Sequence, residues 1–205
     1  MIRDSPLDIR SVLPIFPHVT LNNQNGATQP LIGNLLIASP ALIGGIFERS
    51  VVLLSDHSAE DGAFGLVLNQ PTGKVVGDVL QGEVFHPLRH IAVFQGGPVA
   101  EDNLFFSAFW WDEKTGLQSS NQIAAEEAIR LHQKSGTLLR AFVGYSGWKS
   151  GQLEDELKEQ SWMVAPPSRE ILGLSHDRGL WSSVLRGLSP FHQLLAEMPR
   201  NPLAN

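Results

Sequence analysis

The stretch GYSGWKSGQLEDELKEQSWMVAPP, residues 144–167, has the pattern of a strand end, a helix and a second strand. The run TLLRAFVGYSG (137–147) predicts a strand, and its two final glycines allow the chain to leave the sheet. Ser150 can cap a helix over residues 151–160, in which two leucines share one face and three carboxylates lie near the positive end of the helix dipole. We expect SWMVAP (161–166) to form a returning strand that ends at two prolines.

Other short runs of aliphatic and β-branched residues, each closed by turn formers, predict more strands. They cover residues 33–40, 50–57, 63–71, 91–98 and 103–111. Asp61-Gly62 separates the second run from the third and predicts an antiparallel hairpin. Gly65 lies inside the third run, where a glycine indicates a bulge or a close approach of another chain segment.

Three further segments predict helices. Residues 74–80 are long enough for one or two turns, and residues 119–136 predict the longest helix, capped by Ser119 or Ser120 and ended by Gly136. A third helix, within residues 179–191, would bury one stripe of apolar side chains. That stripe consists of Leu180, Trp181, Val184, Leu185 and Leu188.

The order of these elements predicts an α+β fold with a mixed, mainly antiparallel sheet. Strands occur in adjacent pairs early in the chain and alternate with helices later. The polar segment 18–30 is rich in turn formers, so we expect residues 1–30 to form an N-terminal arm or linker. Residues 31–205 are then expected to form one domain, a length that can bury a sizeable core.

The composition excludes several classes of function. The 205-residue chain has no cysteine, which removes disulfides, thiol catalysis and thiolate metal sites. Its net charge is −6 and its 15 basic residues are scattered, so direct contact with nucleic acid is not expected. No apolar run reaches the ~20 residues needed to span a bilayer, and the N-terminus lacks the pattern of a signal peptide. We therefore expect a cytoplasmic protein without a membrane contact.

The residue patterns do not predict a nucleophile or a metal site. GYSGW places Ser146 beside a displaced second glycine and so departs from the esterase pattern G-x-S-x-G. His86 and His90 have the helical spacing of metal ligands, but Pro87 permits only a helix start there and no carboxylate follows in register. We expect no catalytic residue, no metal and no cofactor.

Two features leave alternatives open. His57 lies at the end of a predicted strand, where it is either a solvated turn residue or a functional loop residue. The turn QGGP (95–98) is either a tight turn or a set of backbone amides that could bind an anion. The acidic residues 154–156 favour a solvated helix face over an acid–base site.

Several of these stretches, in order, resemble the YqgE/AlgH family of bacterial proteins. They are GNLLIASPAL (33–42), FERSVVLLSDHSAEDGAFGLVLNQP (47–71), VFQGGPV (93–99), the opening stretch, LW (180–181) and AEMPRNPLAN (196–205). Two positions depart from the expected pattern: Gly44-Gly45 stand where residues such as Asp-Pro are expected, and Ser146 stands where alanine is expected. The resemblance implies one domain whose sheet curls into a partial barrel flanked by helices. It also implies the label of a transcriptional regulator, although the sequence has no helix-turn-helix signature.

The leading hypothesis is a non-enzymatic binding or regulatory domain for a protein or small-molecule partner, with its oligomeric state left open. Its surface would use strand-end and loop residues that could converge in one cleft lined by the QGGP and GYSGW loops. These residues are His57, Asn69, Gln95, Gly96, Gly97, Tyr145, Trp148 and Gln152. The alternative is an enzyme for a small anionic or phosphorylated metabolite, with His57 as acid–base group and the Gly96 and Gly97 amides holding the anion. A carboxylate paired with His57 would favour that alternative.

Overall fold

The computed structural model describes residues 31–197 of the chain, so the predicted arm over residues 1–30 lies outside the described part. Its centre is the predicted hairpin, formed by β2 (Val51–Ser58) and β3 (Gly62–Val67). His57 pairs with Ala63 across this hairpin, and the register shifts between Leu54 and Asp56. Gly65 confirms the expected close approach, because a Cβ there would lie 2.8 Å from Cγ1 of Val52.

Within residues 31–197 the sheet has nine strands and curls around β8 (Thr137–Trp148), which connects its two parts. The strand order is β4-β5-β8-β3-β2-β1-β9, and β6 and β7 form a hairpin that pairs with β8 through β6. The remaining bounds are β1 (Leu35–Ala38), β4 (Pro71–Val75), β5 (Ala92–Gln95), β6 (Val99–Asp112), β7 (Gly116–Ile123) and β9 (Trp162–Ala165). Among the strands of the described part, only β5 and β8 pair in parallel, so the mixed, mainly antiparallel sheet is confirmed.

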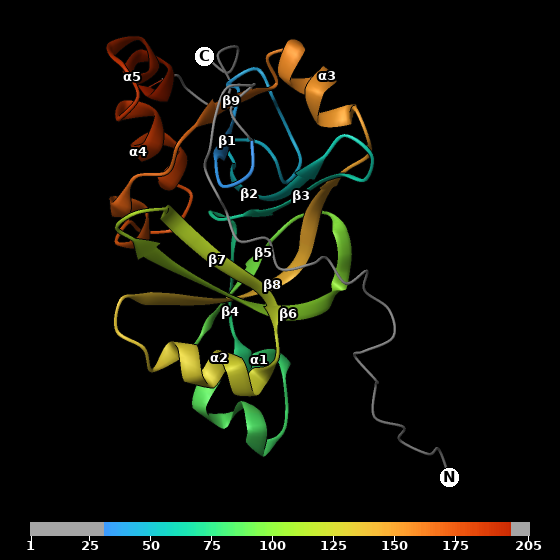
Figure 1. Cartoon of the computed structure of the whole chain (residues 1–205), viewed down its shortest axis with the longest axis vertical. Helices are drawn as coiled ribbons and strands as arrows, with labels where there is room; N and C mark the ends of the chain where they lie inside the picture. Colours follow the sequence, from blue (N-terminus) through green and yellow to red (C-terminus); the bar gives the residue numbers. More distant parts are fainter. Residues whose placement is uncertain (1–30, 198–205) are drawn as a thin grey trace.

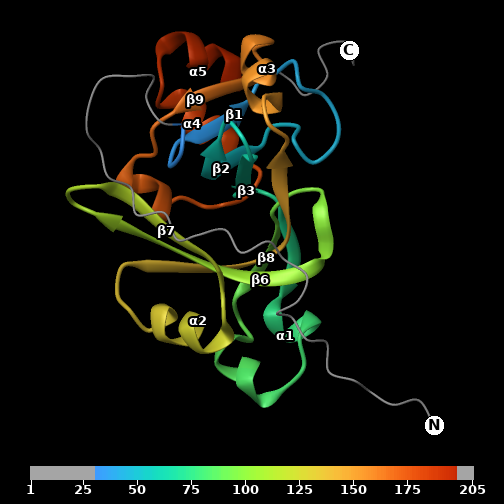
Figure 2. The same ribbon diagram turned by 45° about the vertical axis from the view of Figure 1, so that its right-hand side comes forward.

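Figure 1 shows how β8 joins two halves of the molecule. In the lower half it pairs with β5 and β6, and in the upper half with β3. Helix α2 (Ala125–His132), the short α1 (Val76–Val79) and the 3-10 helix η1 (Glu83–Leu88) lie in the lower half, as Figure 2 also shows.

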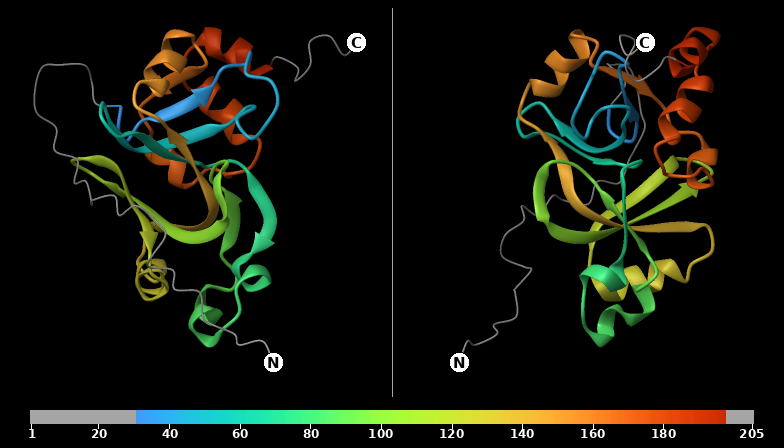
Figure 3. Two further views of the ribbon diagram at one scale, coloured as in Figure 1. Left: turned by 90° about the vertical axis from the view of Figure 1, so that its right-hand side faces the viewer. Right: turned by 180° about the vertical axis from the view of Figure 1, so that it is seen from behind.

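The upper half carries the other helices. They are α3 (Gln152–Lys158), α4 (Leu180–Arg186) and α5 (Pro190–Glu197), with the 3-10 helix η2 (Arg169–Leu172) in the connection before α4. In the right-hand view of Figure 3, as in Figure 1, α3 lies on one side of the upper strands and α4 and α5 on the other. None of the helices within residues 31–197 has the length and apolar character needed to span a bilayer.

Three apolar clusters fill the spaces between the sheet and these helices. The first packs Trp181, which is fully buried, against strand residues such as Phe142. The second places Ala128 of α2 against the lower strands, and the third places Leu153 of α3 against Trp148 and its neighbours. The upper sheet is therefore covered on both faces, as its nearly continuous apolar strands require.

The prediction of a long helix over residues 119–136 is wrong in its first part. Ser119 and Ser120 lie in β7, opposite Phe109 and Ala108 of β6, and α2 begins only at Ala125 without a side-chain cap. A turn before Gly116 returns the chain onto the aromatic strand β6, and this long-range pairing overrides the local helical pattern.

Two further predictions are also wrong, one about a helix cap and one about the packing of a helix. Helix α3 begins after Gly151, which has a φ of 77°, and the Ser150 hydroxyl instead donates to the carbonyl of Ala59 at 2.5 Å. The third predicted helix divides into α4 and α5 around residues 187–189, so Leu188 is 37% exposed and does not belong to the buried stripe.

Candidate functional site

The eight predicted site residues do not converge in one cleft, because neighbouring side chains of β8 point to opposite faces of the sheet. Tyr145 packs against Phe64 on one face, with ring centroids 5.2 Å apart. Trp148 lies on the other face, stacked on Phe47 at 6.4 Å and edge-on to Trp162 at 6.1 Å. The residues fall into three groups. Gln95, Gly96 and Gly97 lie in the QGGP turn with Tyr145; His57, Trp148 and Gln152 lie on the face of the sheet beside α3, called the α3 face below; and Asn69 lies at a pocket of its own.

The QGGP turn lies directly against the GYSGW segment, with backbone packed on backbone. The N–H of Gly96 donates to the carbonyl of Val143 at 2.9 Å, and its carbonyl accepts from Val67 N–H at 2.9 Å. A Cβ on Gly97 would lie 2.1 Å from the carbonyl carbon of Tyr145. The two loops meet as expected, but the Gly96 amide is already used and does not hold an anion in this arrangement.

Ser146 is part of the same closed packing. It is fully buried, and its hydroxyl donates to the carbonyl of Gly96 at 3.0 Å. A nucleophilic serine must present its oxygen to a substrate and to a base. Ser146 does neither here and acts as a structural residue. Gln95, at the edge of the turn, donates from its side chain to Glu101 at 2.8 Å.

The α3 face holds His57 beside a carboxylate. The register places His57, Ala63 and Trp148 side by side on three neighbouring strands, so their side chains share one face. There His57 Nε2 lies 2.6 Å from Oε1 of Glu154. A backbone hydrogen bond at Glu154 and then the hydrogen bond with His57 hold the pKa of the Glu154 carboxyl below its usual value of 4.5.

Glu156 is the centre of a second polar contact on this face, which the sequence did not predict. Its Oε2 accepts hydrogen bonds from Nε1 of Trp148 at 2.8 Å and Nε1 of Trp162 at 2.7 Å. Its Oε1 accepts from the side chain of Gln152 at 2.9 Å. The expectation that residues 154–156 form only a solvated helix face is therefore wrong for Glu154 and Glu156. The i, i+4 spacing of Gln152 and Glu156 was the available local signal.

Asn69 lies apart from both groups and forms the floor of a polar pocket. It is fully buried: its Oδ1 accepts from the N–H of Val51 and its Nδ2 donates to the carbonyl of Arg49, both at 2.9 Å. Three chain segments meet here, so the pocket could not be read from one local pattern. It is lined by Gly45, Glu48, Arg49, Asn69, Gln70 and Arg178.

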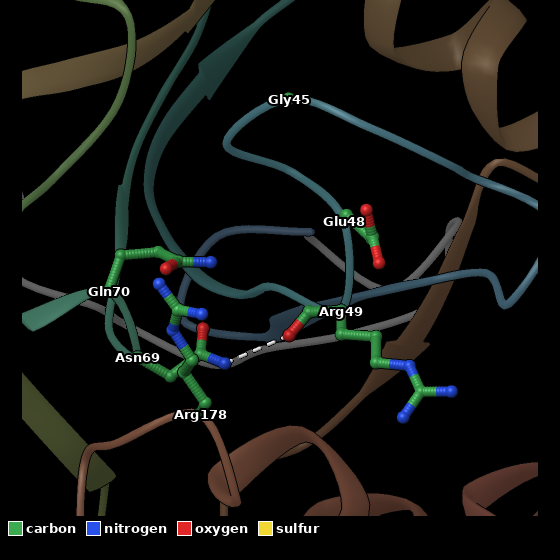
Figure 4. Close-up of a pocket in the computed structure, with 6 residues that line it drawn as sticks. All are labelled: Gly45, Glu48, Arg49, Asn69, Gln70 and Arg178. Carbon is green, nitrogen blue, oxygen red and sulfur yellow. Dashed lines mark hydrogen bonds between the residues drawn. The ribbon is translucent and has the colours of Figure 1, made fainter. Parts of the chain in front are cut away.

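The side chains of this pocket differ in how firmly they are held. Gln70 donates to the carbonyl of Ile46 at 3.3 Å, and Glu48 Oε2 accepts from the N–H of Gly44 at 3.0 Å. Figure 4 shows Arg178 extending toward the amides of Asn69 and Gln70, whereas the Arg49 guanidinium points away from them. Arg49 instead lies over the ring of Trp181 at 4.9 Å. Within residues 31–197, no hydrogen bond or ion pair engages the exposed Arg178 side chain.

The family model for AlgH-like proteins matches residues 35–191. A UPF0301 protein of Cytophaga hutchinsonii is 35% identical over 84% of this chain and 98% of its own length. Another, from Streptomyces avermitilis, is 36% identical over 85% of this chain and 95% of its own.

Two solved structures share the fold. The protein DIP2367 of Corynebacterium diphtheriae has a TM-score of 0.64 and 24% identity, over 85% of this chain and 95% of that one. The AlgH protein of Pseudomonas aeruginosa has a TM-score of 0.59 and 23% identity, over 86% and 99% respectively. Their folds support the single α+β domain with its curled sheet.

Proposed function

This chain belongs to the AlgH-like family, and we propose that it is a non-enzymatic cytoplasmic binding domain with a regulatory role. The observation that carries the proposal is the polar pocket around Asn69. Its floor is fixed by the Asn69 amide, which accepts from the N–H of Val51 and donates to the carbonyl of Arg49. Arg178 extends into the pocket without a protein partner among the described residues. A charged donor at a preformed polar pocket supports recognition of an acceptor group on a ligand.

The charges of the pocket indicate the class of ligand. A guanidinium with amide donors nearby suits a carboxylate or phosphate oxygen, which it can bind through two parallel hydrogen bonds. Glu48 lies in the same pocket and would repel a ligand that is negative throughout. We therefore expect a ligand, or the side chain of a protein partner, that presents an anionic group to Arg178 and a donor group to Glu48.

The test compares the native chain with Arg178→Gln in a thermal-shift screen of amino acids, dicarboxylates and phosphorylated metabolites. We expect at least one compound to raise the melting temperature of the native chain, and Arg178→Gln to abolish that shift. Arg186→Gln is the matched control, because Arg186 is an exposed arginine of α4 that does not line the pocket. An equal ligand shift in Arg178→Gln would show that the pocket is not the binding site.

A regulatory role through direct DNA contact is not part of the proposal. The net charge of −6 opposes association with a phosphate backbone, so regulation would proceed through a protein or a small molecule. A gel-shift assay with a salt titration checks this. Retention of DNA that weakens steeply with added salt would contradict it.

The His57–Glu154 contact favours a second candidate, an enzyme for a small anionic metabolite. A carboxylate 2.6 Å from an imidazole can orient the ring, as it does for a histidine that transfers protons in acid–base catalysis. The Gly96 amide is not available as the anion site of this enzyme. Turnover of a metabolite by the native chain, lost in a folded His57→Ala variant and retained in Arg178→Gln, would establish this candidate in place of the binding domain.

A further inference from the structure

His90 and His132 form a pair of imidazoles on the surface of the lower half, well away in sequence from each other. His90 follows η1 and precedes β5, and His132 is the last residue of α2. These segments pack together, and Figure 1 shows α2 beside the η1 region. The two Nε2 atoms lie 3.1 Å apart, and the ring centroids lie 5.0 Å apart.

This geometry suits two ligands of one metal ion. Imidazole nitrogens bind Zn²⁺ at about 2.0–2.1 Å, so two nitrogens 3.1 Å apart correspond to an N–metal–N angle of about 98°. That angle lies between the square-planar and tetrahedral values. The ring centroids lie 5.0 Å apart, closer than two rings aligned end to end along the N···N line would be, so the ring axes are tilted off that line. The lone pairs therefore can converge on a point beside the N···N line.

We propose that His90 and His132 bind one divalent transition-metal ion of borderline softness, such as Cu²⁺, Ni²⁺ or Zn²⁺. Imidazole suits these ions, whereas Mg²⁺ and Ca²⁺ prefer oxygen ligands. Among the described residues, no third histidine or carboxylate joins the pair in a group that could hold a metal, so water completes the coordination. The site is thus an open, two-ligand site of modest affinity.

The sequence pattern did not indicate this pair. The metal-like spacing in HPLRH joins His90 to His86, but His86 lies within η1 and contacts Arg89, with a separation of 3.3 Å between Nε2 and the guanidinium nitrogen. The partner that reaches His90 is instead 42 residues away, on α2. A bound ion would link the end of α2 to the segment before β5 and so stabilise the lower half.

The experiment titrates the full-length chain, without an affinity tag, with Cu²⁺, Ni²⁺, Zn²⁺ and Mg²⁺ by calorimetry. We expect binding of one transition-metal ion per chain at this pair, tightest for Cu²⁺, and no heat with Mg²⁺. His132→Ala and His90→Gln should each weaken Cu²⁺ binding at least about tenfold, since even loss of an outer-shell partner costs 10–100-fold. His86→Ala is the matched control and should bind Cu²⁺ like the native chain.

Two further readouts distinguish this site from other histidines. The electron paramagnetic resonance spectrum of the Cu²⁺ complex should show two equivalent nitrogen ligands, and one or none in His132→Ala. Cu²⁺ should also raise the melting temperature of the native chain and of His86→Ala but not of the two site variants. Unchanged affinity in both His132→Ala and His90→Gln, each with a native circular dichroism spectrum, would overturn the proposal.

Discussion

Glu156 connects α3 to the sheet through a single carboxylate. Three N–H donors from Trp148, Trp162 and Gln152 converge on its two oxygens. The indole rings also pack edge-on to each other and around Phe47, so the carboxylate satisfies the only polar atoms of two side chains in an apolar cluster. Hydrogen bonds to a charged acceptor are stronger than neutral ones, and losing such an acceptor leaves buried donors unpaired.

We therefore expect Glu156→Gln to lower the free energy of unfolding by about 1–3 kcal/mol, the usual cost of leaving a partly buried polar group unpaired. The glutamine offers one acceptor oxygen, and its NH₂ group would face another donor. Urea denaturation followed by tryptophan fluorescence measures the change. Asp155→Asn is the control, because the Asp155 side chain is 70% exposed and pairs with the exposed Lys158. An unchanged midpoint in Glu156→Gln would show that water replaces the carboxylate without cost.

His176 is a second residue whose environment predicts a measurable effect. It is buried, and its Nε2 lies 2.7 Å from the carbonyl of Ile171, to which the neutral ring donates. Burial lowers the pKa of His176 below its usual 6.5; the charge of Arg140 also lowers this pKa, while the hydrogen bond to Ile171 and the charge of Asp177 raise it. The folded protein therefore resists protonation of this ring more than the unfolded chain does.

The sign of the pH dependence follows from this difference. Above pH 6.5 the ring is neutral in both states and its stabilising contribution is complete. As the pH falls below that value the unfolded chain gains a proton that the folded state does not, and stability is lost. We expect His176→Gln, whose amide can still donate to Ile171, to show a shallower loss of stability between about pH 6.5 and 5. The measurement is the free energy of unfolding as a function of pH, and His86→Gln, at an exposed histidine, is the control that should follow the native chain. Equal slopes of this free energy in the native chain and in His176→Gln would contradict the prediction.

At the scale of the elements, the predicted strands are mostly correct because their signal is local. The β2–β3 hairpin follows from Asp61-Gly62 between two aliphatic runs, and β9 follows from SWMVAP. The β7 strand could not be predicted because Ser119 and Ser120, before the run 123–131, have the local pattern of a helix cap. Only its pairing with the aromatic strand β6 decides its conformation.

The connection between β5 and β6 gives an element-scale prediction. Gly97 has a φ of 156°, and a Cβ there would meet the backbone of Tyr145 at 2.1 Å. Because that neighbour is backbone, it cannot move aside as a side chain would. We expect Gly97→Ala to lower the free energy of unfolding by several kcal/mol, or to prevent recovery of folded protein.

Gly151, just before α3, is the matched control for this substitution. Its φ of 77° is also left-handed, but a Cβ there would meet nothing within 4 Å. Gly151→Ala should therefore cost only the conformational term, about 1–2 kcal/mol. Thermal and urea denaturation of both variants measure the two costs separately, because Gly151→Ala carries backbone strain alone and Gly97→Ala also carries the close contact with Tyr145. Equal losses in the two would show that the contact of the QGGP and GYSGW segments adds no constraint.

At the scale of the whole molecule, the fold class was predictable and the site was not. Adjacent strand pairs followed by alternating helices indicate an α+β domain, and this conclusion needs no side-chain contact. The site depends on contacts such as His57 with Glu154, which are 97 residues apart. Their positions depend on the strand register and on which face each residue occupies, and a local sequence pattern shows neither across 97 residues. For the same reason the sequence grouped Tyr145 with Trp148, although they lie on opposite faces.

Because β8 belongs to both halves of the sheet, we expect the two halves to unfold as one unit. Leu88→Ala tests this, since Leu88 is fully buried in the lower cluster and lies outside β8. Removing its side chain should cost about 2–5 kcal/mol. Amide hydrogen exchange should then show the same loss of protection in the β2–β3 hairpin of the upper half as in β5. Protection that falls in β5 and stays native in β2 and β3 would mean that the shared strand does not couple the halves.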